Sequence, residues 1–173
     1  MMLKRAPRWF LLAALSLSLG SLTGCGLHPL YEGGNSGIAA TGLRSVEVAP
    51  ISQRSGWLTR NALVDRLGGE HPAARYRLEV ELDDSLIGFG IRGDAAATRE
   101  RRTLRARYRL VESASGAVLV DATAGSEAGI DVVSSEYATV VAEQSAAERL
   151  SQLVADQIVA RLARYMTVAP RRP

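Results

Sequence analysis

The sequence predicts an α+β two-layer sandwich in which two helices pack on one face of a four-stranded sheet, in the order β-α-β-β-β-α. Three consecutive segments alternate apolar and polar residues, which is the period of a strand with one buried face. Two other segments repeat apolar residues at helical spacing. Strands with a single apolar face need a cover on that face only, and two amphipathic helices provide it.

The first strand lies in the segment SVEVAP, residues 45–50, and Pro50 ends it. A helix follows from about Ser55 to Leu67, and the glycine pair after it supplies a left-handed stop. A strand, a helix and a second strand in this order are compatible with a parallel crossover.

The next three strands lie in RYRLEVEL, RRTLRARYRLV and AVLVDAT. Their alternation predicts one core-facing set: Tyr76, Leu78, Val80, Leu82, Leu104, Ala106, Tyr108, Leu110, Val118, Val120 and Ala122. From Ser135 the period changes to that of a long amphipathic helix, which ends near Pro170. Its predicted apolar stripe begins with Tyr137, Val140 and Val141 and continues to Tyr165.

The chain before this domain has the features of a secretory signal. Lys4, Arg5 and Arg8 precede an apolar run, Trp9 to Leu22, that is shorter than the roughly 20 residues of a bilayer-spanning helix. A basic start followed by a short apolar run is typical of a cleaved signal peptide. We therefore expect residues 1–24 to be removed.

The single cysteine, Cys25, ends the segment LTGC, which resembles the bacterial lipobox. That resemblance implies a diacylglycerol on the thiol and a further acyl chain on the freed amine. Two or three acyl chains anchor a protein stably to a membrane, whereas one chain binds marginally. Gly26 follows where, by resemblance to other lipoproteins, an aspartate favours the inner membrane, so we expect the outer membrane.

Composition excludes several classes of function. The mature chain has 18 basic and 18 acidic residues, because three of the 21 Lys and Arg lie in the signal, so its charge does not indicate nucleic-acid binding. Acylation of Cys25 leaves no thiol for a disulfide, a nucleophile or a zinc site. We expect no cofactor other than the covalent lipid, and no metal.

The mature chain is long enough for one domain with a core. The Gly-rich composition before Leu43 predicts that residues 25–42 form a lipidated flexible tether. We expect a single domain over residues 43–166 and a disordered tail over residues 167–173.

No set of residues predicts catalysis. His28 and His71 lie far apart, without a cysteine or carboxylate at metal-ligand spacing. Asp83 and Asp84 form a carboxylate pair, but they follow a strand and precede a Gly-containing segment, which favours capping of a turn. The sequence therefore predicts a protein that is not an enzyme.

The second of the three consecutive strands carries a row of arginines on its polar face. One interpretation pairs them across the hairpin with Glu79 and Glu81. The other assigns them to anionic ligand groups, because guanidinium groups bind phosphates bidentately. The candidate lipopolysaccharide-binding residues are Arg92, Arg99, Arg101 and Arg105. Arg92 and Arg99 fall in a predicted loop without an evident partner.

That predicted loop extends from Asp83 to Ala97 and is long for a hairpin. It contains the apolar residues Leu86, Ile87, Phe89 and Ile91 between glycines. Such residues either fold back onto the domain or contact a partner. The sequence leaves both interpretations open.

Several segments together are similar to a known family. CGLHPLY at residues 25–31 resembles the CGF-x-PLY start of alphaproteobacterial LPS-assembly lipoproteins, the LptE family. RNALVDRL (60–67), YRLEV (76–80), ATR (97–99) and residues 148–164 are similar too. Leu27 replaces the expected phenylalanine, a mild change at an apolar position.

The resemblance implies a lipoprotein that plugs the lumen of an LptD-like outer-membrane β-barrel, the LPS translocon. It also implies that the protein helps the barrel to assemble and binds lipopolysaccharide during export. The family fold, two helices on a four-stranded sheet, agrees with the order derived above. An alternative function is the auxiliary lipoprotein of a lipid-transporting ABC system, and a cell-wall enzyme would require Asp83 and Asp84 to act as paired acids.

Overall fold

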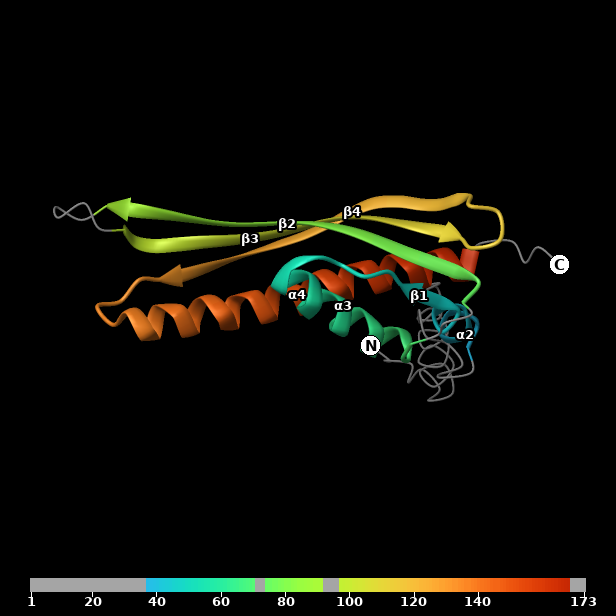
Figure 1. The fold of residues 1–173 in the computed structure, drawn as a ribbon, viewed down its shortest axis with the longest axis horizontal. Helices are drawn as coiled ribbons and strands as arrows, with labels where there is room; N and C mark the ends of the chain where they lie inside the picture. The colour runs from blue at the N-terminus through green and yellow to red at the C-terminus, as the bar shows by residue number, and fades with distance from the viewer. Residues whose placement is uncertain (1–36, 71–73, 92–96, 169–173) are drawn as a thin grey trace, which may run out of the picture.

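The computed structural model describes residues 37–70, 74–91 and 97–168. A four-stranded sheet forms one layer and the helices form the other, which confirms the predicted α+β sandwich (Figure 1). The elements in chain order are α2 (Ile38–Leu43), β1 (Val46–Val48), α3 (Gln53–Leu67), β2 (Tyr76–Ile91), β3 (Ala97–Glu112), β4 (Val118–Asp131) and α4 (Glu136–Val168). Among these helices, none is both long and apolar enough to cross a membrane.

The strands lie in the order β1-β2-β3-β4. β1 pairs with β2 in parallel, so the chain must cross over between them, and α3 forms this predicted crossover. The pairs β2–β3 and β3–β4 are antiparallel. β2 and β3 have 16 residues each, which corresponds to a length of about 50 Å.

The core lies between the helices and the inner face of the sheet. Leu78 and Leu110 from the strands are fully buried, as are Leu63 from α3 and Ile158 and Leu162 from α4. The alternation of β2 and β3 therefore predicts the buried face correctly. Burial of a leucine side chain contributes roughly 1.5–3 kcal/mol, so this cluster supplies much of the stability.

The short helix α2 corrects the predicted extent of the tether. Residues 38–42, expected to be flexible, form most of this helix, and Ala39 and Leu43 are buried. Gly42 packs against the last turns of α4: a Cβ on this residue would lie 2.9 Å from Met166 Cγ. Because Ala39 and Leu43 are buried and Gly42 lies close to Met166, α2 is part of the domain.

Helix α3 ends as predicted. Gly68 adopts a left-handed conformation with φ of 95°, and its N–H donates to the carbonyl of Val64. Glycine is the residue that adopts this conformation without a steric penalty. An ion pair between Arg66 and Asp156 then joins the end of α3 to α4.

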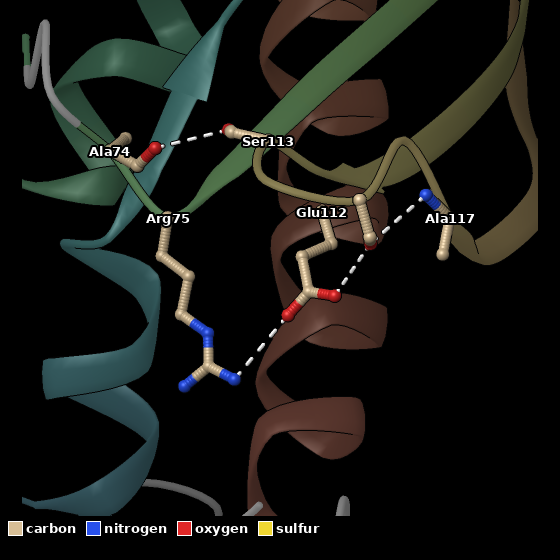
Figure 2. Close-up of polar contacts among 6 residues, drawn as sticks. Ala74, Arg75, Glu112, Ser113 and Ala117 are labelled. Carbon is tan, nitrogen blue, oxygen red and sulfur yellow. Dashed lines mark hydrogen bonds and ion pairs between the residues drawn. The ribbon is translucent and has the colours of Figure 1, made fainter.

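The turn between β3 and β4 is held against the start of β2 (Figure 2). The Ser113 hydroxyl donates to the carbonyl of Ala74 at 3.0 Å, and Arg75 Nη2 donates to Glu112 Oε1 at 3.4 Å. Gly116 has φ of 71° and its N–H donates to the Glu112 carbonyl at 2.8 Å. These contacts confirm the predicted turn over Ser113–Gly116.

The predicted loop over Asp83–Ala97 is wrong. β2 continues to Ile91 and β3 begins at Ala97, with the register running from Asp83↔Arg105 to Ile91↔Ala97. Pairing between the two strands satisfies the backbone amides in spite of the aspartates and glycines that suggested a loop. Only residues 92–96 of the predicted loop lie outside both strands, and they fall outside the described residues.

Helix α4 confirms the predicted long helix, but its first turns are not covered. Leu150 and Val154 are buried as expected, whereas Tyr137 is 79% exposed and Val140 and Val141 are 41% and 42% exposed. Figure 1 shows the reason, since α4 continues along the sheet past the point where α3 begins. One helix alone therefore covers the inner face at that end.

Candidate functional site: the arginine face of the sheet

The outer face of β3 carries the predicted row of arginines. We call the surface formed by Arg99, Arg101, Arg105, Arg107 and Arg109, with the outward residues of β2 and β4, the arginine face. It points away from α3 and α4, which both pack on the other face (Figure 1). Strand alternation places every second residue of β3 on this surface.

Three of these five arginines form ion pairs with carboxylates, and two of them, Arg107 and Arg109, do so in the second half of β3. Arg109 lies 3.2 Å from Glu79 and 3.9 Å from Glu81, which confirms the predicted cross-strand pairing for this residue. Arg107 donates through Nη2 and Nε to the two carboxylate oxygens of Asp121, at 3.0 and 3.3 Å. The hydrogen bond from Arg107 lowers the pKa of the Asp121 carboxyl below its ordinary value.

Arg99 differs from its predicted environment. It lies in β3 rather than in a loop, and its Nε is 3.2 Å from Asp131 of β4, so the expectation that it lacks a partner is wrong. Both side chains are largely exposed, and such a pair contributes little to stability. Arg92 lies outside the described residues, as do Cys25, His28 and His71.

Arg101 packs on an aromatic ring instead of a carboxylate. Its guanidinium carbon lies 5.3 Å from the centroid of Phe89, which is cation–π distance. Both side chains are exposed on the outer face. In the described part of the chain Arg101 has no ion pair, so a guanidinium beside an apolar ring is available to a ligand.

Arg105 lies at the centre of the arginine face beside a surface depression of about 530 Å3. Its register neighbours are Asp83 on β2 and Gly125 on β4. A Cβ on Gly125 would come within 3.4 Å of Arg105 Cγ, so the glycine leaves space for the stem of the arginine. Among the described carboxylates, none forms an ion pair with Arg105.

Two guanidinium groups of the arginine face, those of Arg101 and Arg105, lack a carboxylate partner among the described residues. Arg101 and Arg105 are four residues apart on one strand face, which corresponds to about 13 Å. Guanidinium groups bind phosphate bidentately, and an aromatic ring next to one of them accepts apolar contact. The geometry suits a ligand with more than one anionic group and an apolar part.

A second cluster lies on the inner face and was not predicted. Arg102 Nε and Nη2 donate to the two carboxylate oxygens of Asp84 at 2.9 and 2.7 Å, and Nη1 donates to the Glu143 carbonyl at 3.2 Å. The side chains are only 20% and 13% exposed. This cluster fixes the first half of α4 to the sheet. The signal was available, because the alternation that buries Leu104 also turns Arg102 inward.

The same geometry bears on the carboxylate pair Asp83–Asp84. Neighbouring residues in a strand point to opposite faces, so Asp83 lies on the arginine face while Asp84 pairs with Arg102 inside. The predicted turn-capping role is wrong, because both residues lie within β2. Their opposite orientation also removes the paired-acid arrangement that a hydrolase of this kind would need. Within the described residues, no group of three His, Cys, Asp or Glu side chains is placed to hold a metal ion.

Comparison with known families gives one match. The family model LptE, described as Lipopolysaccharide-assembly, matches residues 43–162. The match covers the chain from the end of α2 to the later turns of α4, and so includes the whole sheet. No curated protein sequence matches this chain significantly.

Several solved structures share this fold, and three of them are described as lipoproteins. A lipoprotein from Caulobacter crescentus superposes with a TM-score of 0.64 and 23% identity, covering 78% of this chain and 99% of that one. Rare lipoprotein B from Shewanella oneidensis gives 0.55 and 10%, with 70% and 96% covered. Lipoprotein B from Nitrosomonas europaea gives 0.54 and 11%, with 72% and 88% covered. At these identities the likeness shows a shared fold.

Proposed function

Because this chain belongs to the lipopolysaccharide-assembly family LptE, we propose that it is an outer-membrane lipoprotein that plugs the β-barrel of the LPS translocon and binds lipopolysaccharide during export. The family match over residues 43–162 is the observation that carries this proposal. The proposed role is assembly and binding rather than catalysis. The partners are an LptD-like barrel protein, the glycolipid and the membrane that holds the anchor.

The dimensions of the domain support a plug. β2 and β3 are about 50 Å long, and the 33 residues of α4 give a similar length. A bilayer with its headgroups is roughly 40–45 Å thick, so the domain is long enough to extend through the height of a barrel. The outer face of its sheet is charged, which suits the polar interior of such a barrel.

The arginine face supports binding of a phosphorylated glycolipid. Arg101 with Phe89 and Arg105 beside its depression offer two cationic groups without carboxylate partners and one exposed ring. Arg99 already pairs with Asp131, so we propose a weaker contribution for it, whereas Arg92 stays a candidate on the sequence alone.

We predict that Arg105→Ala weakens binding of lipopolysaccharide by about tenfold, the loss expected for one charge-assisted contact. Titration of the purified protein with lipopolysaccharide measures this. Arg107→Ala is the matched control, because it removes the same charge from the neighbouring outward position, where the guanidinium already pairs with Asp121. Equal affinities for both variants would remove Arg105 from the proposed site.

We predict that Cys25→Ser, produced without the barrel partner that would otherwise retain it, loses membrane attachment and keeps the domain folded, since the acyl chains then provide the anchor. Membrane fractionation and circular dichroism of the released protein measure the two parts. A Cys25→Ser protein that stays in the membrane fraction contradicts the proposed anchor.

The partner is tested by detergent extraction of the lipidated protein. Co-extraction with the LPS-translocon barrel is expected. Co-extraction instead with an ABC permease or its lipid-binding subunit contradicts the plug and indicates the auxiliary-lipoprotein alternative.

A further inference from the structure

The 14 residues of β4 form one open edge of the sheet, and the part of β2 beyond Leu78, which β1 does not cover, forms another. In an antiparallel sheet, alternate residues direct both N–H and C=O either to the neighbouring strand or away from it. Gly125 directs both groups away from β3, since they bond to Gln157 of α4. Its neighbours at alternate positions, including Asp121, Thr123 and Glu127, therefore present their backbone groups at the edge.

The side-chain amide of Gln157 bonds to this edge in the same way as the backbone of an added strand would. Its Nε2 donates to the Gly125 carbonyl at 3.1 Å, and its Oε1 accepts from the Gly125 N–H at 3.2 Å. A primary amide thus reproduces the two hydrogen bonds that an added strand would make with Gly125. Among the described residues, no other side chain bonds to the outward backbone groups of β4.

A groove lies beside the edge, next to Gln157. It has a volume of about 590 Å3 and runs between Ala122–Ala124 of β4 and Ala160, Arg161 and Arg164 of α4. The small side chain of Ala160 leaves the groove open at this position. Arg161 and Arg164 also line the groove; both are exposed, and neither forms an ion pair with the described residues. The lining contains two cationic side chains and no carboxylate.

We propose that the open edge of β4 between Asp121 and Gly125 binds an extended polypeptide segment as a fifth strand, with acidic side chains of that segment paired to Arg161 and Arg164. Strand addition provides backbone hydrogen bonds for affinity and side-chain contacts for specificity. The Gln157 side chain leaves Gly125 as the segment binds. The proposed strand uses the backbone edge and the groove against α4, whereas the proposed lipopolysaccharide contacts are side chains of the arginine face; Thr123 and Ala124 border both sites.

The charges of the groove favour an acidic segment over a second copy of this chain. Two copies joined edge to edge by a twofold axis would bring both pairs of Arg161 and Arg164 toward the same seam. Like charges across a strand pair destabilise it. A segment with carboxylates at alternate positions instead neutralises the groove.

The test uses the full lipidated protein in detergent and a fluorescent peptide of alternating valine and glutamate. The decisive variant is Thr123→Pro, because the Thr123 N–H points outward and its loss leaves the β3–β4 hydrogen bonds intact. Thr123→Val is the matched control, since it retains the N–H. We expect Thr123→Pro to weaken peptide binding at least tenfold, with unchanged circular dichroism, and Thr123→Val to bind as the wild type does.

Two further variants test the other parts of the site. Gln157→Ala removes the competing amide and is expected to strengthen binding severalfold. Arg161→Glu with Arg164→Glu is expected to weaken binding of the glutamate peptide and strengthen binding of a valine–lysine peptide. Arg54→Glu with Arg77→Glu, two exposed arginines that do not line the groove, is the charge-matched control and should leave both affinities unchanged.

Failure of the wild-type protein to bind the glutamate peptide overturns the proposal. Equal binding by the wild type and Thr123→Pro also overturns it, because the edge amide is then not used. Self-association of the wild type that Thr123→Pro abolishes, without peptide binding, identifies a second copy as the occupant and overturns the acidic segment.

Discussion

The two ends of the sandwich are built from different contacts. At the end that contains β1, α3 and α4 lie on the inner face and α2 packs against α4; the facing side chains are leucines such as Leu63, Leu78 and Leu110, all fully buried. At the opposite end α4 alone covers the sheet, and the inward residues include Asp84 and Arg102. One end is therefore held by a leucine-rich core, whereas the other combines fewer buried apolar residues, such as Leu104 and Ile130, with one ion pair and its hydrogen bond to α4.

This difference indicates how stability is distributed. A region with few buried apolar contacts opens at lower free energy than a leucine core does. The apolar side chains that α3 does not reach, such as Leu86 and Tyr137, are exposed at 43% and 79%. We call the end of the sandwich that contains β1 the near end, and the opposite end, where Leu86 and Tyr137 lie, the far end.

The largest expected effect is the difference in unfolding free energy when an apolar side chain is shortened at each of the two ends. Leu110→Ala at the near end should lower the free energy of unfolding by about 2–5 kcal/mol, because it opens a cavity in a closed core. Leu86→Ala at the far end should cost less than about 1 kcal/mol, because the side chain is already half exposed. Urea unfolding of both variants measures the difference, and equal losses would show that the two ends are equally packed.

The second effect concerns the ion pair at the far end. Arg102→Met should lower the free energy of unfolding by about 2 kcal/mol, less than the ~3–5 kcal/mol of a fully buried pair, because both partners are partly exposed. Amide exchange should quicken in α4 near Glu143, whose carbonyl loses its donor.

Two variants control that measurement. Arg107→Met breaks an exposed ion pair on the outer face and should leave stability unchanged. Adding Asp84→Leu to Arg102→Met should restore part of the loss, because no charge is then left without its partner. A double variant as unstable as the single one would mean that the Glu143 contact, and not the ion pair, holds α4.

The smallest effect depends on pH. Burial and the nearby Glu143 carboxylate raise the pKa of Glu100 above its ordinary 4.5. The folded chain thus binds this proton more tightly than the unfolded chain, so ionised Glu100 lowers stability above its folded-state pKa, and this penalty is absent below about pH 4.5. Glu100→Gln should therefore stabilise the protein at pH 7 but not at pH 4, as measured by urea unfolding. A gain that is equal at both pH values contradicts this origin.

Much of the near end was predictable from sequence alone. The alternation around Leu78 and Leu110 predicts the buried face, because each strand there has a single apolar side. The Gly68 stop follows from the rule that left-handed helix ends favour glycine. The start of α2 was not predictable, because the apolar Ala39 and Leu43 are embedded in small residues that favour a tether.

The far end shows why the remainder was not predictable. Asp83 to Gly90 has the composition of a loop, and only its pairing with β3 makes it a strand. Sequence alternation turns Arg102 inward, but its partner Asp84 becomes evident only once the register is known. The contact between Gln157 and Gly125 joins residues that are far apart in sequence, and no local pattern indicates it. Of the arginine candidates, the common face of Arg101 and Arg105 was predictable, whereas the position of Arg99 in β3 and its pairing with Asp131 were not.

The packing of α2 against the last turns of α4 has a practical consequence for labelling. The described chain begins and ends at the same end of the sandwich, where Gly42 packs against Met166. A reporter protein fused after Val168 would stand beside α2, where the described chain begins, and leave the opposite end of the sandwich unobstructed. A fluorophore that reports on contacts of the opposite end should instead be attached at an internal position there, such as the exposed Tyr137.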